Sequence, residues 1–258
     1  MLLKVIQIAV EAGKATLTYY RQQSTAVSFK ADQSPLTEAD LEADRLILKG
    51  LQDLDNSIPC ISEERGVPEF AERKSWKRFW LVDPLDGTKE FLKGTGDFTV
   101  NIALIENNEP VLGVVYAPVT ATAYYAEKGK GSWKQVYGGK PERIYSRVMP
   151  SNEGLIVAES RSHPSKELEA ILKNIKVLKR IQVGSSLKFC LVAEGAADIY
   201  PRLGTTMEWD TAAGDCVYRN SGKEGPRPSP LVYNKPSLKN GNFIIGGEHS
   251  NIQAAGSC

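Results

Sequence analysis

Histidine and cysteine are scarce in this chain of 258 residues, which contains 2 His and 4 Cys. The cysteines, at positions 60, 190, 216 and 258, form no Cys-x-x-Cys pair, so neither a zinc site nor a disulfide scaffold is indicated. A catalytic metal would therefore be held mainly by oxygen. Widely spaced thiols suit a reducing compartment, and we expect a cytoplasmic protein, with peripheral membrane association left open.

Long hydrophobic runs and an excess of one charge are also lacking. No segment approaches the roughly 18 consecutive apolar residues that span a bilayer, and the N-terminus has no signal-peptide cleavage pattern. The 32 Lys and Arg against 31 Asp and Glu give a net charge of +1. Such a balance gives no reason to expect a nucleic acid partner. We expect a small-molecule partner, no transmembrane segment, and either a monomer or a homodimer.

Hydrophobic periodicity predicts an α/β (α+β) layered fold in two parts that meet along a cleft. Residues 1–150 should hold two helices followed by a mostly antiparallel sheet. In residues 151–258, strands alternate with helices, which is typical of an α/β layered arrangement. The expected helices are 2–21, 37–54, 164–174, 185–194 and 210–218; the expected strands are 58–62, 79–82, 98–105, 111–116, 121–127, 132–135, 155–158, 177–183 and 198–201.

The segment Trp80–Phe91 (W-L-V-D-P-L-D-G-T-K-E-F) is chemically the most informative. An apolar strand is expected to end at Asp83, and the proline and glycine that follow favour a tight turn. Such a turn can aim Asp83 and Asp86 at one point and turn the Leu85 carbonyl outward, which offers the hard oxygen ligands that suit Mg²⁺. The Gly87–Thr88 start of a short helix can offer N–H groups to a phosphate. Taken alone, however, this sequence is more typical of a simple polar turn.

Other acidic residues also have simple structural explanations when each is taken alone. Glu63 and Glu64 follow a predicted strand and could lie in a solvated turn. Asp210 could cap a helix, and Asp40, three residues after Thr37, resembles part of a capping box. Together, Glu63, Asp83, Asp86 and Asp210 could supply the anionic oxygens that hold two dications about 3.5–4 Å apart, with the Leu85 carbonyl as a further ligand.

The order of these motifs resembles that of the inositol-monophosphatase superfamily. D-P-L-D-G-T at 83–88, the acidic pair at 63–64 and W-D-T-A-A-G at 209–214 are similar to its three signatures. Further segments resemble the branch of 3′(2′),5′-bisphosphate nucleotidases. They are K-A-D-Q-S-P-L-T-E-A-D at 30–40, L-D-G-T-K-E-F at 85–91, S-R-S-H at 160–163 and G-S-S-L-K-F-C-L-V-A-E-G at 184–195. The resemblance extends from about residue 4 to 246.

The resemblance implies a fold like that of inositol monophosphatase and fructose-1,6-bisphosphatase, with two or three Mg²⁺ ions as cofactor. The implied metal ligands are Glu63, Asp83, the Leu85 carbonyl, Asp86 and Asp210. Asp40 and Thr88 would orient and activate the attacking water. The implied substrate-binding residues are Gly87, Thr88, Ser160, His163, Gly184 and Lys188.

The activity that the resemblance implies is hydrolysis of 3′-phosphoadenosine 5′-phosphate to AMP and phosphate, as in sulfur assimilation, with inhibition by lithium. A further candidate substrate is 3′-phosphoadenylyl sulfate. An inositol monophosphatase or other sugar phosphatase is the alternative within the superfamily. The G-S-S-L-K segment favours the nucleotidase, because Lys188 could neutralise a second phosphate that inositol monophosphate lacks. A non-catalytic metal- or nucleotide-binding regulator is the alternative of a different class, and the intact set of acids argues against it.

Overall fold

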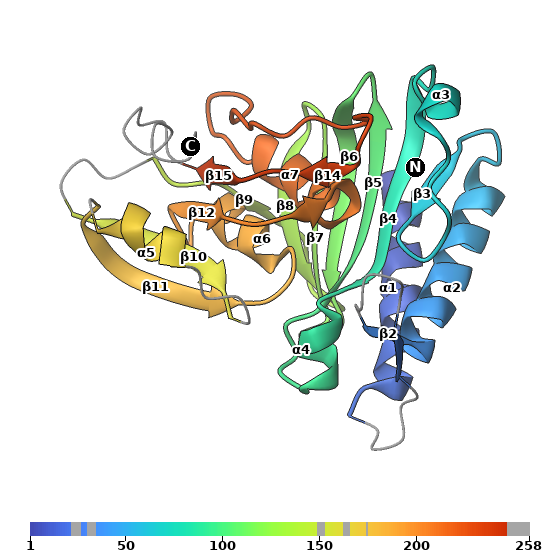
Figure 1. Cartoon of the computed structure of the whole chain (residues 1–258), viewed down its shortest axis with the longest axis horizontal. Helices are drawn as coiled ribbons and strands as arrows, with labels where there is room; N and C mark the ends of the chain where they lie inside the picture. Colours follow the sequence, from blue (N-terminus) through green and yellow to red (C-terminus); the bar gives the residue numbers. More distant parts are fainter. Residues whose placement is uncertain (22–26, 30–34, 149–152, 162–165, 174, 247–258) are drawn as a thin grey trace.

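The computed structural model describes residues 1–21, 27–29, 35–148, 153–161, 166–173 and 175–246. These residues form alternating layers of helix and sheet (Figure 1). Two long helices cover one side of a seven-stranded sheet, and further helices followed by a four-stranded sheet lie on the other side. The layered α/β fold class predicted from the sequence is confirmed.

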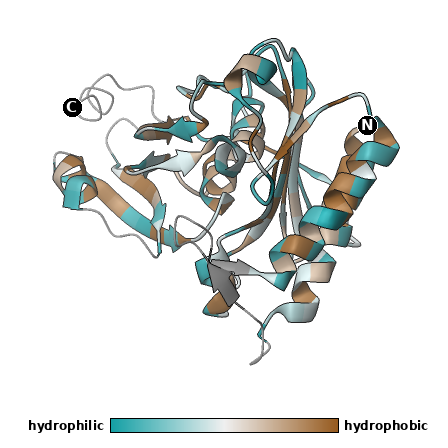
Figure 2. Ribbon diagram, turned by 45° about the vertical axis from the view of Figure 1, so that its right-hand side comes forward, coloured by the Kyte–Doolittle hydropathy of each residue, from teal (hydrophilic) through white to brown (hydrophobic). Residues whose placement is uncertain are grey.

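The outermost layer consists of helices α1 (Leu2–Tyr19) and α2 (Glu38–Leu54), both of which the sequence predicts. Apolar residues recur every three or four positions along α1, so one face of the helix is apolar and packs on the sheet (Figure 2). An unpredicted hairpin of β1 (Val27–Phe29) and β2 (Pro35–Thr37) precedes α2. No helix in the described part of the chain is long and apolar enough to cross a membrane.

The central layer is a seven-stranded sheet in which only the first pair of strands is parallel. In spatial order its strands are β3 (Cys60–Ser62), β4 (Arg78–Asp86), β5 (Thr99–Glu106), β6 (Glu109–Ala117), β7 (Thr122–Glu127), β8 (Gly131–Val136) and β9 (Glu142–Ile144). Helix α3 (Phe70–Arg73) precedes β4, and α4 (Thr88–Leu92) follows it. The predicted strands 98–105, 111–116, 121–127 and 132–135 correspond to β5–β8 and pair as two antiparallel hairpins, β5 with β6 and β7 with β8, whereas β9 was not predicted.

The alternation of side chains along β4 decides which of its residues face the interior of the molecule. Trp80 and Val82 pack in the core cluster under α1 and α2. Phe79 and Leu81 pack in the cluster on the opposite face, together with residues of α7. Because successive side chains of a strand point to opposite faces, Asp83 continues the series of Phe79 and Leu81. Its carboxylate therefore lies on the α7 side of the sheet.

Helices α6 (Leu187–Ala193) and α7 (Glu208–Arg219) form the next layer, and α7 lies directly on the seven-stranded sheet. The approach is close because glycines face the helix backbone and its neighbour. A Cβ on Gly113 of β6 would lie 2.6 Å from the Ala213 carbonyl oxygen, and one on Gly214 would lie 2.7 Å from Phe189. Glycine at these two positions therefore permits the close packing of α7.

The last layer is a four-stranded sheet with the spatial order β11 (Val177–Val183), β10 (Leu155–Ser160), β12 (Ile199–Arg202) and β15 (Phe243–Gly246). Strand β10 is parallel to β11 and β12, whereas β15 is antiparallel to β12. Helix α5 (Lys166–Leu172) packs against this sheet. A pair of two-residue strands, β13 (Thr206–Met207) and β14 (Lys239–Asn240), leads into α7.

The predicted division into residues 1–150 and 151–258 stays a prediction. One core cluster draws side chains from both parts, among them Leu81 of β4 and Trp209 of α7. The contact between α7 and the seven-stranded sheet is what brings acidic residues of the two parts together.

Candidate active site

Three carboxylates from separate segments meet on the α7 side of the central sheet. One oxygen each of Glu63, Asp83 and Asp210 lies within 4.8 Å of the others. Glu63 follows β3, and its backbone N–H donates to the Val82 carbonyl oxygen at 3.1 Å. Asp83 lies within β4, and Asp210 lies in the first turn of α7. The fold thus assembles three of the acids that the sequence analysis singled out.

A β-bulge explains how Asp83 and Asp86 reach the same side of the sheet. Strand β4 does not end at Asp83, as the sequence suggested, but continues to Asp86. Asp83 pairs with Asn101, and Asp86 pairs with Thr99, so β4 contains one extra residue between the two pairs. Asp83 and Asp86 are three residues apart, so in a regular strand the alternation of side chains would place them on opposite faces, and the bulge returns them to the same face. The Leu85 N–H donates to Asp83 Oδ1 at 3.0 Å and stabilises the bulge.

Asp86 is held by its own network of hydrogen bonds. Its Oδ2 accepts one from the Ser186 N–H at 2.6 Å and one from Asn101 Nδ2 at 3.3 Å. The Ser186 hydroxyl in turn donates to Asn101 Oδ1 at 2.7 Å. Burial raises the pKa of Asp86 to about 6, while nearby Lys188 and the Ser186 N–H oppose this rise. Asp86 is therefore oriented by partners from both β5 and the start of α6.

Burial also raises the pKa of Asp83 and of Asp210 well above the usual range, and the neighbouring carboxylates raise both further. Asp83 is only 1% exposed. Ionised carboxylates packed this closely repel one another unless a positive charge compensates them. Carboxylate oxygens are the ligands that hard dications such as Mg²⁺ prefer. The residues therefore fit a divalent metal ion.

We expect the metal-free protein to be more stable near pH 5.5 than near pH 7.5. A carboxyl whose pKa is raised by folding contributes stability below its unfolded value of about 4, and this contribution is lost as the pH rises through the folded value. For Asp86 that value is about 6. In the presence of a chelator, Asp210→Asn should raise the unfolding temperature near pH 7.5 and flatten its dependence on pH. The exposed Asp53→Asn serves as the control, and equal pH dependence in all three proteins would contradict the proposed repulsion.

Asp40 and Asp210 occupy equivalent positions in their helices. Asp40 Oδ2 accepts a hydrogen bond from the Thr37 N–H at 2.8 Å, so the capping box suggested by the sequence is present. Asp210 Oδ2 accepts one from the Met207 N–H, also at 2.8 Å. Capping therefore fixes the orientation of both carboxyl groups. This structural role is compatible with a second role in the site, because a carboxylate has two oxygens and several lone pairs.

The turn between β4 and α4 depends on Gly87. Its φ of 96° lies in the left-handed region, and a Cβ there would lie 3.1 Å from the Asp97 carbonyl oxygen. Thr88 is the first residue of α4, and its hydroxyl donates to the Leu85 carbonyl oxygen at 3.5 Å. The joint role of Asp40 and Thr88 in orienting and activating the attacking water stays a prediction.

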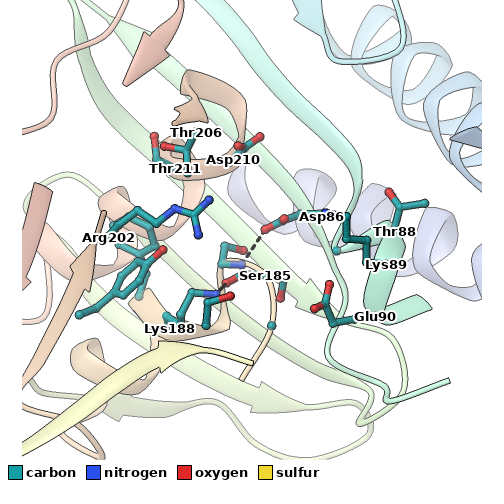
Figure 3. A pocket seen from close by; sticks show the side chains of 16 residues that line it. Asp86, Thr88, Lys89, Glu90, Ser185, Lys188, Arg202, Thr206, Asp210 and Thr211 are labelled. Atoms are coloured by element: carbon teal, nitrogen blue, oxygen red, sulfur yellow. Dashed lines mark hydrogen bonds between the residues drawn. The ribbon is translucent and has the colours of Figure 1, made fainter. Parts of the chain in front are cut away.

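A cavity of about 210 Å³ opens beside the carboxylates (Figure 3). Both Asp86 and Asp210 line it, so the cavity reaches the acidic cluster directly. The predicted substrate residues that line it are Gly87, Thr88, Ser160, Gly184 and Lys188. His163 lies outside the described residues.

The loop before α6 forms one wall of the cavity. A Cβ on Gly184 would lie 2.5 Å from the Asp97 carbonyl oxygen, so close packing alone accounts for a glycine there. Ser185 has a φ of 50°, and its carbonyl oxygen accepts a hydrogen bond from Lys188 Nζ at 2.6 Å. Burial lowers the pKa of Lys188 to about 8, against the opposing effect of Asp86. Lys188 thus remains mostly protonated at neutral pH and gives this wall a fixed positive charge.

The fold also brings to the cavity polar residues that were not predicted from the sequence, foremost Arg202 at the end of β12. Figure 3 shows its guanidinium pointing into the cavity, on the side of Asp86 and Asp210. Arg202 lies one residue beyond the predicted strand 198–201, and only the structure extends β12 to it, which puts it on the same face as Tyr200. Other missed residues that line the cavity are Lys89, Glu90, Thr206 and Thr211.

Comparison with known protein families and sequences agrees with this geometry. Residues 2–252 match the model of the inositol monophosphatase family. The chain is 49% identical over 218 residues to the 3′(2′),5′-bisphosphate nucleotidase CysQ of Salmonella typhimurium strain LT2. The alignment covers 84% of this chain and 86% of that protein.

Solved structures show the same relationship. CysQ from Bacteroides thetaiotaomicron, described as a bacterial member of the inositol monophosphatase family, is 39% identical with a TM-score of 0.79. That match covers 96% of this chain and 97% of the other. The extragenic suppressor protein suhB from Bartonella henselae is 27% identical with a TM-score of 0.80, covering 98% of this chain and 95% of that one.

Proposed function

The chain belongs to the inositol monophosphatase family, and we propose that it is a 3′(2′),5′-bisphosphate nucleotidase that hydrolyses 3′-phosphoadenosine 5′-phosphate to AMP and phosphate. The observation that carries this proposal is the cavity itself. Two of its walls differ in charge, with carboxylates on one and the buried cation of Lys188 on another. Such a site suits a substrate with one phosphate held through metal ions and a second anionic group further away.

We propose two or three Mg²⁺ ions as the cofactor. Glu63, Asp83 and Asp210 would hold them, because their oxygens converge, and Asp86 and the Leu85 carbonyl would complete the ligands. When bound, Mg²⁺ supplies positive charge for the reacting phosphate and lowers the pKa of a water molecule toward neutrality.

The residues at the start of α4 would position the reacting groups. Gly87 turns the chain so that the first N–H groups of α4 can face the phosphate. The Thr88 hydroxyl would accept the proton of the attacking water or direct its lone pair, with Asp40 orienting Thr88. The attack is in line with the departing 3′-oxygen, and no side chain needs to form a covalent phosphoenzyme.

The opposite wall would bind the nucleoside part of the substrate. Ser160 and Gly184 line the cavity next to the Lys188 wall, and we propose that they contact the nucleoside together with His163. The Gly184 and Ser186 N–H groups of this wall are already hydrogen-bonded to Asp97 and Asp86, which would spare the substrate the cost of ordering the wall.

The first test is phosphate release from 3′-phosphoadenosine 5′-phosphate and from inositol 1-phosphate, measured side by side in Mg²⁺ with and without Li⁺. We expect a strong preference for the nucleotide, and inhibition by Li⁺. A preference for the inositol ester would contradict the substrate but leave the metal site in place. Release from neither compound would contradict the proposed activity.

A further inference from the structure

Asp97 lies two residues before β5 and joins two segments that are far from it in the chain. Its Oδ2 forms an ion pair with Arg161 Nε at 2.8 Å and accepts a hydrogen bond from the Gly184 N–H at 3.3 Å. The Asp97 side chain is 17% exposed, so solvent screens its charge only in part. One carboxylate oxygen thus connects the residue after β10 and the loop before α6 to the start of β5.

Both of these segments belong to the cavity wall that we propose for the nucleoside. Ser160, directly before Arg161, lines the cavity, and so does Gly184. Arg161 Nη2 also donates to the Gln182 carbonyl oxygen at 3.0 Å, which ties the end of β10 to the end of β11. Asp97 is not among the described residues that line the cavity. Its effect on a ligand therefore passes through the wall and not through direct contact.

The backbone of Asp97 fits closely between this wall and the turn that follows β4. Its carbonyl oxygen would lie 2.5 Å from a Cβ on Gly184 and 3.1 Å from a Cβ on Gly87. The loop and the turn are thus packed against the same peptide group. Because the Gly87 turn carries the groups proposed for the reacting phosphate, Asp97 sets the spacing between the phosphate site and the nucleoside wall.

The loop before α6 has a conformation that benefits from such an anchor. Ser185 has a φ of 50°, in the left-handed region that residues other than glycine seldom adopt. Lys188 Nζ holds the Ser185 carbonyl oxygen from within α6, whereas Asp97 holds the loop from the other side of the cavity wall. Loss of the Asp97 carboxylate removes the partner of one backbone N–H and of one guanidinium, which favours local opening of the loop.

From these contacts we infer that Asp97 is a positioning residue, which holds the nucleoside wall in register with the phosphate site. The inference rests on the proposed function. A nucleotide loses affinity when the Asp97 carboxylate is removed, because binding must then order the loop as well. A phosphate ester that is too small to reach the wall does not depend on Asp97.

The test compares Asp97→Ala with the wild type on 3′-phosphoadenosine 5′-phosphate and on p-nitrophenyl phosphate, which has no nucleoside. For the nucleotide, KM should rise about 3- to 20-fold with kcat nearly unchanged, since bound substrate restores the order of the loop. For p-nitrophenyl phosphate, kcat/KM should change less than about twofold. Glu109→Ala is the matched control. It breaks the exposed ion pair of Glu109 with Lys128, which do not line this cavity, and should leave both substrates unaffected.

Amide hydrogen exchange of residues 182–188 gives a readout that needs no turnover. These amides should exchange about threefold faster or more in Asp97→Ala than in the wild type, and saturating AMP should reduce the difference. Asp97→Glu keeps the charge and should restore part of both the protection and the nucleotide KM. Asp97→Asn keeps an acceptor for the Gly184 N–H but loses the ion pair, so its KM should lie between those of the wild type and Asp97→Ala.

Unchanged exchange in Asp97→Ala would overturn the inference. Equal losses of kcat/KM on the two substrates would overturn it as well, because they would indicate a disturbed metal site or a folding defect. If the wild type released no phosphate from either substrate, the proposed function would fail. The exchange of residues 182–188 and its reversal by AMP would then decide the role of Asp97 separately.

Discussion

Asp83→Asn should remove nearly all phosphatase activity while the protein stays folded. Asp83 belongs to the acidic cluster, where its oxygen lies within 4.8 Å of those of Glu63 and Asp210. An amide of the same shape keeps an oxygen but loses the charge that binds a dication. We expect kcat/KM to fall by roughly 10³-fold or more, because both the positioning and the charge stabilisation of the reacting phosphate depend on that metal.

The stability of the same variant should change in the opposite direction to its activity. Burial and neighbouring carboxylates raise the pKa of Asp83, so its ionised form destabilises the metal-free fold at neutral pH. The unfolding temperature without metal should therefore rise, while the increase that Mg²⁺ produces in the wild type should shrink. Thermal unfolding with Mg²⁺ and with a chelator measures both effects.

Asp215→Asn is the matched control for a buried aspartate. Asp215 lies on α7 but pairs with Arg219 Nε at 2.8 Å and accepts a hydrogen bond from the Tyr233 hydroxyl. Its replacement should lower stability and leave kcat and the Mg²⁺ response nearly unchanged. If Asp83→Asn kept most of its activity, or if both variants behaved alike, the assignment of Asp83 as a metal ligand would be wrong.

Thr88→Ala should lower kcat by about 10²-fold with little change in KM, which is the usual effect of losing a group that assists proton transfer. Alanine is a good helix former, so α4 should still begin at this residue. The response of the unfolding temperature to Mg²⁺ should match that of the wild type, because the Thr88 side chain is not among the proposed metal ligands. Steady-state kinetics at saturating Mg²⁺ provide the measurement.

Thr88→Ser separates the hydroxyl from the methyl group of the side chain. Serine keeps the donor that bonds the Leu85 carbonyl oxygen, so this variant should recover most of the lost kcat. An unchanged kcat in Thr88→Ala would remove Thr88 from the mechanism. A loss of the Mg²⁺ response in that variant would instead place the residue in the metal site.

The sequence by itself determined the layered fold class, the long helices and the central hairpins. Each of these carries a local signal, namely a helical or alternating apolar period long enough to be recognised. Short elements had no such signal. Strands β13 and β14 are two residues each, and β9 is three, so their pairing depends on distant partners and not on their own pattern.

The sequence also determined which acids were candidates. Each acid lies in a short continuous motif, such as D-P-L-D-G-T, that can be recognised without knowledge of the fold. Which atoms meet was decided by the tertiary structure. The bulge in β4 turns Asp83 and Asp86 to the same face, and the packing of α7 on that face adds Asp210. Arg202 carries no local mark of function and enters the cavity because β12 ends there. Register and helix packing are interactions between residues far apart in the chain, so no local period or spacing encodes them.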